Sequence, residues 1–135
     1  MEEHVVVIDG DREARDRLVE LLSSELERTC LEAWNAEEGL RLLQHRAPLL
    51  AFIGDALPDR DGMEFLEQVR EQHPLFSTIY VSEDESATTV LRAFRLGVRD
   101  FLSKPIDRGE VTAAVRRIIA SEVPSNRLAD LTRDL

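Results

Sequence analysis

The chain has 135 residues and a mass of 15.4 kDa, which suits a single domain with a substantial core. Its formal net charge of −10 would repel a phosphate backbone, so we expect no direct nucleic-acid binding by this domain. No stretch approaches transmembrane length and the N-terminus is acidic, so we expect a soluble cytoplasmic protein without membrane contact. The single cysteine, Cys30, excludes an internal disulfide, and we expect it to be a buried, inert thiol.

Short apolar runs alternate with amphipathic helical patterns along the chain. The predicted elements, in chain order, are strand 5–8, helix 12–27, strand 30–34, helix 35–45, strand 49–53, helix 62–72, strand 78–81, helix 86–96, strand 100–103 and helix 107–120. Gly97 is the expected C-cap of the fourth helix. Five strand–helix units of this size predict an α/β fold with a parallel, doubly wound sheet covered on both faces.

The domain is expected to span residues 1–121. Residues 122–135 contain Pro124, followed by Leu128, Leu131 and Leu135 at helical spacing. We expect this segment to be a C-terminal tail or linker, with a short terminal helix, a connection to a further domain and a frayed end as open alternatives.

Polar residues follow the predicted strands where each strand ends. Asp9-Gly10-Asp11 follows the first strand, Gly54-Asp55 the third, Ser82 the fourth and Lys104-Pro105 the fifth. In a doubly wound sheet the functional crevice lies outside the carboxyl ends of the strands, so these residues are the candidate site.

These residues, together with the segment 90–105, resemble the receiver domain of two-component response regulators, and especially the nitrogen-fixation regulator type. The similarity covers nearly all of residues 4–120. It implies a flavodoxin-like fold with strand order 2-1-3-4-5 and a role in phosphorelay signal transduction. In that family an acidic pair and a phosphoacceptor aspartate hold Mg²⁺, while a hydroxyl and a lysine bind the phosphoryl oxygens.

Carried over to this sequence, the resemblance assigns the hydroxyl to Ser82, the lysine to Lys104 with Pro105 after it, and the switch aromatic to Phe101. Asp9 matches the first acid of the pair. The second acid falls on Gly10, and the acceptor falls on Gly54 when positions are counted back from the loop 57–62. Glycine has no nucleophile, so we expect a degenerate acidic pocket (Asp9, Gly10, Asp11, Gly54, Asp55) with no metal, no cofactor and no enzymatic activity.

Two alternatives remain open. Asp55, adjacent to Gly54, is a candidate phosphoacceptor that would work with Mg²⁺, although side-chain alternation along a strand would turn it to the other side. The other is a module that binds a small anion or nucleotide at the strand ends, for which Gly10 is the only signal.

Structural roles also account for several of these residues. Asp11 is expected to cap the first helix, Ser82 to cap the turn into the fourth, and Lys104 to form an ion pair with Asp9 or Asp55. Phe101 is expected to be a fixed core aromatic, and Trp34 and Tyr80 to be packing residues. The histidines have no ligand-like spacing and are assigned no metal: His4, His45 and His73.

A basic face is predicted around the fourth helix, the fifth strand and the fifth helix. Its arginines are interspersed with apolar residues such as Leu91, Phe94 and Val98, and they are Arg92, Arg95, Arg99, Arg116 and Arg117. In receivers this face makes dimer and output contacts, so the expected partners are an output domain, a kinase or a second copy of the chain. We therefore expect an atypical receiver that acts by protein–protein contact without Mg²⁺-dependent phosphorylation.

Overall fold

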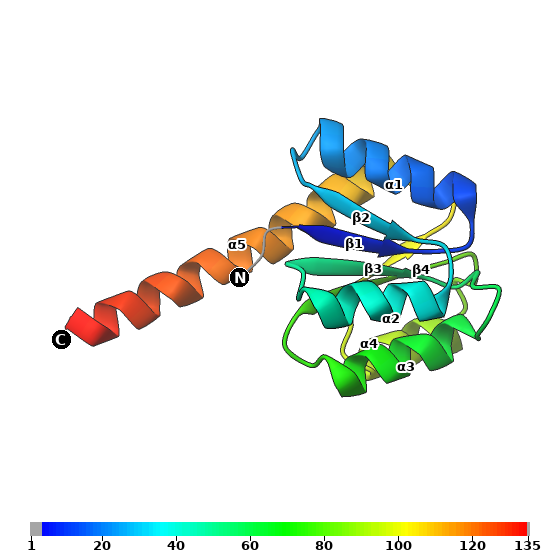
Figure 1. Cartoon of the computed structure of the whole chain (residues 1–135). Helices are drawn as coiled ribbons and strands as arrows, with labels where there is room; N and C mark the ends of the chain where they lie inside the picture. Colours follow the sequence, from blue (N-terminus) through cyan, green and yellow to red (C-terminus); the bar gives the residue numbers. More distant parts are fainter. Residues whose placement is uncertain (1–3, 135) are drawn as a thin grey trace.

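The computed structural model describes the backbone of residues 4–134 and the side chains of residues 4–121 (Figure 1). The elements, in chain order, are β1 (Val5–Ile8), α1 (Arg12–Ser24), β2 (Cys30–Ala33), α2 (Ala36–His45), β3 (Leu50–Gly54), α3 (Gly62–Gln72), β4 (Ser77–Ser82), α4 (Ala87–Arg95), β5 (Asp100–Ser103) and α5 (Arg108–Asp134). Each predicted strand and helix is present.

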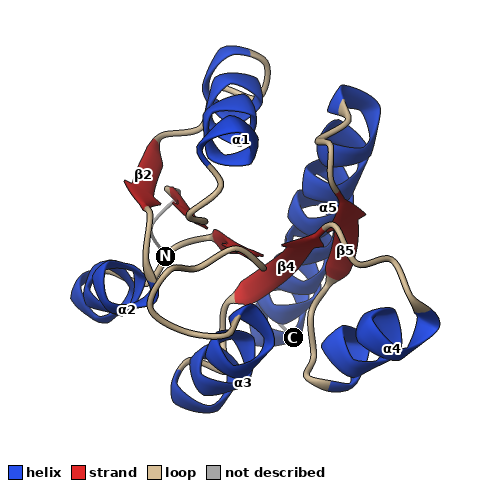
Figure 2. Cartoon of the chain, turned by 90° about the vertical axis from the view of Figure 1, so that its right-hand side faces the viewer, coloured by secondary structure: helices blue, strands red, loops and turns tan. Residues whose placement is uncertain are grey.

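The five strands form one parallel sheet in the order β2-β1-β3-β4-β5, as the resemblance implies. α1 and α5 cover one face, and α2, α3 and α4 cover the other (Figure 2). The predicted doubly wound α/β class is confirmed.

Alternation along each strand supplies both faces of the sheet. On β1, Val5 and Val7 pack with α1 and α5, whereas Val6 and Ile8 pack with α2, α3 and α4. A strand buried on both faces reads as a continuous apolar run, which explains why these segments show no polar alternation. The registers place Ile8 beside both Ala33 and Ile53, so β1 and β2 end together and β3 continues one residue further, to Gly54.

Short polar side chains begin all five helices by accepting a hydrogen bond from a backbone N–H in the first turn. The capping residues are Asp11, Asn35, Asp61, Ser86 and Asp107. The cap predicted for Asp11 is present, with Oδ1 3.2 Å from the Ala14 nitrogen. Gly97 follows α4 with a φ of +96°, a left-handed conformation that suits glycine.

Two helix ends differ from the prediction. α1 ends at Ser24, because the chain turns at Glu27, whose φ is +53°, and Arg28 N–H bonds back to the Leu22 carbonyl. α5 does not end near Ala120 but continues to Asp134, beyond the sheet (Figure 1). The expected boundary after residue 121 therefore falls inside a helix, and the contacts of the tail lie outside the described side chains.

Two packing predictions require correction. Trp34 is not a packing residue: it is 59% exposed, because it lies where the chain leaves β2, before α2 begins at Ala36. Cys30 is half-buried rather than buried, and desolvation together with Glu32 raises the pKa of its thiol to about 11. The thiol therefore stays protonated at neutral pH, which agrees with the expected low reactivity.

No described helix combines the length and apolar character needed to cross a membrane.

Candidate functional site

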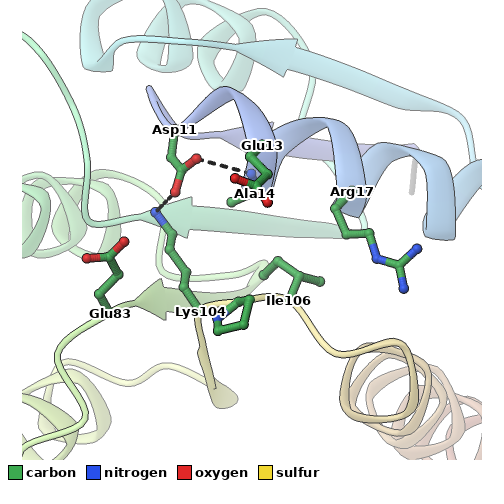
Figure 3. A pocket seen from close by; sticks show the side chains of 8 residues that line it. Asp11, Glu13, Ala14, Arg17, Glu83, Lys104 and Ile106 are labelled. Carbon is green, nitrogen blue, oxygen red and sulfur yellow. Dashed lines mark hydrogen bonds and ion pairs between the residues drawn. The ribbon is translucent and has the colours of Figure 1, made fainter.

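The polar residues of four strands meet at one edge of the sheet, because the carboxyl ends of parallel strands lie together. Asp9 follows β1, Asp55 follows β3, Ser82 ends β4 and Lys104 follows β5. A pocket of about 480 Å³ opens beside Lys104 between the start of α1 and the β5–α5 loop (Figure 3). Its wall combines charged residues with apolar ones: Asp11, Glu13, Ala14, Arg17, Glu83, Pro105 and Ile106.

The ammonium group of Lys104 lies among three carboxylates. Its Nζ is 2.8 Å from Asp55 Oδ1, 2.9 Å from Asp9 Oδ2 and 3.1 Å from Asp11 Oδ2 (Figure 3 shows the Asp11 contact). The Lys104 side chain is only 4% exposed. Burial works to lower the pKa of Lys104, but hydrogen bonds to Asp55 and Asp9 outweigh it and the pKa is raised. A permanent buried positive charge therefore neutralises part of the acidic cluster.

Asp9 is the most buried acid of the cluster, at 2% exposure. Its Oδ1 accepts a hydrogen bond from the Asp11 N–H at 3.0 Å, and its Oδ2 contacts Lys104. Desolvation dominates these contacts and raises the pKa of Asp9 above that of an ordinary aspartate. For Asp11, burial also acts to raise the pKa, but hydrogen bonds from the Ala14 N–H and Lys104 outweigh it and the pKa is lowered.

Asp55 lies inside the crevice. Its Oδ1 is held by Lys104, and its Oδ2 accepts hydrogen bonds from Ser82 Oγ and the Glu83 N–H, each at 3.0 Å. Burial acts to raise the pKa of Asp55, but these donors outweigh it and the pKa is lowered. The expectation that strand alternation turns Asp55 away is wrong, because β3 ends at Gly54 and Asp55 already belongs to the loop.

Both glycines of the acidic pocket face atoms that fill the space of a side chain. A Cβ on Gly54 would lie 2.1 Å from both Cγ and Oδ2 of Asp9. A Cβ on Gly10 would lie 2.3 Å from the Ala56 carbonyl oxygen. The crevice therefore has no space for a side chain at either position unless Asp9 or the β3–α3 loop moves.

The β3–α3 loop is held to the β1–α1 loop and to the start of α2. The Gly10 N–H donates to the Ala56 carbonyl at 2.8 Å. The Asp59 carboxylate accepts from the N–H groups of Ala36 and Glu37 at 2.8 and 3.1 Å, so it adds a second cap to α2. Sequence analysis missed Asp59, because its partners are more than 20 positions away in the chain and no local pattern marks them.

The other residues assigned by resemblance lie around this cluster. Ser82 accepts a hydrogen bond from the Asp84 N–H at 3.0 Å, which is the turn cap expected for it. Pro105 follows Lys104 through a cis peptide bond. Phe101 is half-buried, with its ring centroid 6.0 Å from that of Tyr80.

The predicted basic face is only partly free. Arg117 pairs with Asp100, and Arg99 donates to Ser77, so these two arginines have partners within the domain. Arg92, Arg95 and Arg116 are exposed and form no ion pair with another of the described side chains (residues 4–121). The apolar part of the face lies on α4, where Leu91 is 52% and Phe94 45% exposed, whereas Val98 is buried.

The side chains that could bind a metal ion are the next feature of the site. Among the described residues, no group of three His, Cys, Asp or Glu side chains is arranged to hold a metal ion. The carboxylates of Asp9, Asp11 and Asp55 each contact the Lys104 ammonium.

Comparisons with known proteins agree on one family. The family model for the response regulator receiver domain matches residues 5–116. The transcriptional regulator NtrC of Escherichia coli K12 is 29% identical over 116 residues, which are 86% of this chain and 24% of that protein. The regulatory protein PhoP of Bacillus subtilis is 28% identical over 122 residues, which are 88% of this chain and 49% of that protein. The chain therefore spans about a quarter to a half of the length of these two relatives.

Solved structures give the same result. The receiver domain of NtrX from Brucella abortus superposes with a TM-score of 0.79 at 27% identity, covering 86% of this chain and 98% of that one. A longer NtrX structure covers 97% of this chain and 30% of that one, with a TM-score of 0.84 at 26% identity. The matched residues include both the sheet and the Lys104 cluster, and this chain belongs to the response regulator receiver domain family.

Proposed function

We propose that this chain is an atypical receiver domain that signals by protein–protein contact and is not phosphorylated at residue 54. The observation that carries the proposal is the Asp9 carboxylate, which fills the space in front of Gly54, 2.1 Å from the position of a Cβ there. Glycine supplies no nucleophile, and the carboxylate beside it is paired with Lys104.

The donor set of the crevice does not fit the Mg²⁺ ion that the family implies. Mg²⁺ requires near-octahedral oxygen coordination. Gly10 and Gly54 supply no side-chain oxygen, and the oxygens of Asp9, Asp11 and Asp55 surround the Lys104 ammonium. The proposed function therefore includes no metal-dependent phosphoryl transfer at residue 54. The excess of carboxylates also disfavours the alternative of a small-anion or nucleotide module.

In this proposal the signal leaves through the face formed by α4, β5 and α5. A phosphoryl group would add about −1.5 to −2 of charge to bias a receiver between two states. Here a partner, a ligand or self-association would supply that bias. Exposed Leu91 and Phe94, with Arg92 and Arg95 beside them, give α4 the apolar centre and charged rim of a contact surface. The proposed partners are an output domain, a kinase or a second copy of the chain in the cytoplasm.

The test is intact-mass spectrometry after incubation with acetyl phosphate and Mg²⁺. We expect the mass of the unmodified chain. A receiver domain that has an aspartate at the acceptor position, treated in parallel, serves as the positive control. A stoichiometric phosphoryl adduct on this chain would refute the proposal.

One specific observation favours a second candidate, in which Asp55 is the phosphoacceptor. Its carboxylate contacts both Ser82 and Lys104, which are the hydroxyl and ammonium that the family uses to bind phosphoryl oxygens. This candidate predicts an acid-labile adduct that disappears in Asp55→Asn and persists in Asp107→Asn, a matched change at the cap of α5. Absence of an adduct from both the unmodified sequence and the control variant would exclude it.

A further inference from the structure

The Asp55 carboxylate lies where three hydrogen-bond donors of the crevice converge. Lys104 Nζ is 2.8 Å from its Oδ1, and Ser82 Oγ and the Glu83 N–H are each 3.0 Å from its Oδ2. Hydrogen bonds to an ionised acceptor are about twice as strong as bonds between neutral groups. An anionic group of the chain itself therefore already binds the donors at the ends of β4 and β5.

A chain of hydrogen bonds leads from Asp55 to the start of α4. Ser82 Oγ, which donates to Asp55, accepts from the Asp84 N–H at 3.0 Å. The Asp84 carboxylate in turn accepts from the Ser86 N–H at 2.9 Å and from Thr89 Oγ1 at 2.7 Å. Ser86 is the N-cap of α4, and Thr89 lies in its first turn. The carboxylate is thus linked to the helix that bears the proposed contact surface.

Few buried residues fix the position of α4. Of the nine residues of this helix only Ala93 is buried, whereas five of the eleven residues of α3 are buried. Residues 83–88, which form the loop before α4 and its first two positions, are exposed. Segments with few buried apolar contacts open at low cost in free energy, so polar contacts at the start of α4 contribute much of its order.

Removal of the Asp55 carboxylate would affect one side of the crevice more than the other. Lys104 would keep its contacts with Asp9 and Asp11, whose oxygens lie 2.9 and 3.1 Å from Nζ. The two donors to Oδ2 at the end of β4 would lose the acceptor that they share. The loss would therefore fall mainly on the β4–α4 loop.

We propose that the Asp55 carboxylate acts as a permanent internal anion that orders residues 83–86 and the first turn of α4. A phosphoryl group orders a loop in the same way, by adding negative charge and accepting charge-assisted hydrogen bonds. The carboxylate sets the resting arrangement of the α4 surface without covalent modification, and a partner acts on that arrangement. This inference rests on the proposed function, because it supplies the fixed charge for a receiver that is not phosphorylated at residue 54.

The experiment compares amide hydrogen exchange, measured by NMR at neutral pH, in the ¹⁵N-labelled chain and in its Asp55→Ala variant. The reporter amides are those that donate within the β4–α4 loop or in the first turn of α4, and they are Glu83, Asp84, Ser86, Thr89 and Val90. We expect exchange at the reporter amides to become about fivefold faster in Asp55→Ala, equivalent to the loss of one net hydrogen bond.

Two further variants test the route. Asp107→Ala removes the cap of α5 and controls for a general loss of stability, so exchange at the reporter amides should stay unchanged. Ser82→Ala removes the hydroxyl that links Asp55 to Asp84. In the double variant Asp55→Ala/Ser82→Ala, the increase in the first turn of α4 should be smaller than the product of the two single increases.

A neutral variant tests the need for charge. Asp55→Asn keeps an oxygen acceptor and removes the charge, so we expect its increase to be about half that of Asp55→Ala on a logarithmic scale. No increase in Asp55→Asn would overturn the role of the anion.

Three other outcomes would overturn the inference: unchanged exchange in Asp55→Ala, an equal increase in Asp107→Ala, or fully multiplicative increases in the double variant. No phosphodonor or Mg²⁺ is present in this experiment. A phosphoryl adduct in the mass measurement would refute the proposed function, whereas unchanged exchange here would refute only the role of Asp55.

Discussion

Asp9 and Gly54 face each other at the ends of two neighbouring strands, and at the scale of single residues each depends on the other. The Asp9 carboxylate reaches into the space in front of Gly54, where Lys104 and the Asp11 N–H hold it. Gly54 does not have a positive φ, so its backbone conformation is open to any residue. Steric contact with Asp9, and not backbone strain, therefore requires glycine at this position.

This dependence predicts the effect of Gly54→Ala. The added Cβ would lie 2.1 Å from the Asp9 carboxylate, which must move and weaken its contact with Lys104. We expect the free energy of unfolding to fall by about 1–3 kcal/mol, as for other overpacked cores, in urea denaturation at neutral pH. Gly109→Ala is the matched control, since its nearest contact is 3.3 Å, and we expect it to be neutral or slightly stabilising.

A double variant identifies the cause. If the clash is with Asp9, the loss in Gly54→Ala/Asp9→Ala should be smaller than the sum of the two single losses. Additive losses would mean that Gly54 is required for a reason other than the Asp9 carboxylate.

At the scale of elements, Arg70 joins α3 to the end of α4. Its Nε donates to the Leu96 carbonyl at 3.1 Å, and its Nη1 donates to the Phe76 carbonyl at 3.0 Å. Leu96 is the C-cap of α4, and Phe76 lies just before β4. The single guanidinium of Arg70 thus donates hydrogen bonds to one carbonyl at the end of α4 and to a second carbonyl just before β4.

We therefore expect Arg70→Met to loosen α4 selectively. Loss of both hydrogen bonds should lower the free energy of unfolding by about 2 kcal/mol and increase amide hydrogen exchange in the last turn of α4. Arg41→Met on α2 is the control, because its ion pairs with Glu37 and Glu38 are exposed and contribute about 1 kcal/mol or less. Equal protection of α4 in the two variants would show that Arg70 does not hold this helix.

Local chemistry explains which elements were predictable. Caps such as Asn35 and Asp61, and glycine after α4, act within a few residues, so their patterns identify helix starts and ends in the sequence. The strand-end residues were also predictable, because parallel strands must bring their carboxyl ends together.

Long-range contacts explain what the sequence left undetermined. The orientation of Asp55 depends on where β3 ends, and the second cap from Asp59 depends on how two loops pack. The exposure of Trp34 depends on where α2 begins relative to the sheet. A periodic sequence pattern does not indicate the orientation of Asp55, the partners of Asp59 or the exposure of Trp34. Each of these depends on how distant parts of the folded chain pack together.

At the scale of the whole molecule, the crevice concentrates negative charge in a chain that is already acidic, with a formal net charge of −10. Its acids respond to folding in opposite directions. Folding lowers the pKa of Asp55, whose donors outweigh its burial, and raises that of Asp9, for which burial dominates. The ionised form of Asp55 is therefore favoured by the fold, whereas the ionised form of Asp9 is disfavoured.

Opposite shifts predict opposite pH dependences for two variants of the same chemical type. Because the pKa of Asp55 is lowered by folding, its ionised form stabilises the folded chain at pH values above the unfolded pKa of about 3.9. This stabilisation is lost as the pH falls through the folded pKa. The loss of unfolding free energy caused by Asp55→Asn should therefore become smaller below about pH 4. Because the pKa of Asp9 is raised by folding, the folded chain binds a proton at this carboxylate at a higher pH than the unfolded chain does. The free energy of unfolding of the unsubstituted protein, relative to that of Asp9→Asn, should therefore increase as the pH falls toward about 4. Urea denaturation between about pH 7 and 2.5 measures both differences, and subtraction removes the titration of groups common to both chains. If the stability difference changed with pH in the same direction for both variants, the opposite pKa shifts of Asp9 and Asp55 would be contradicted. Lys104 and burial would then affect the two carboxylates alike.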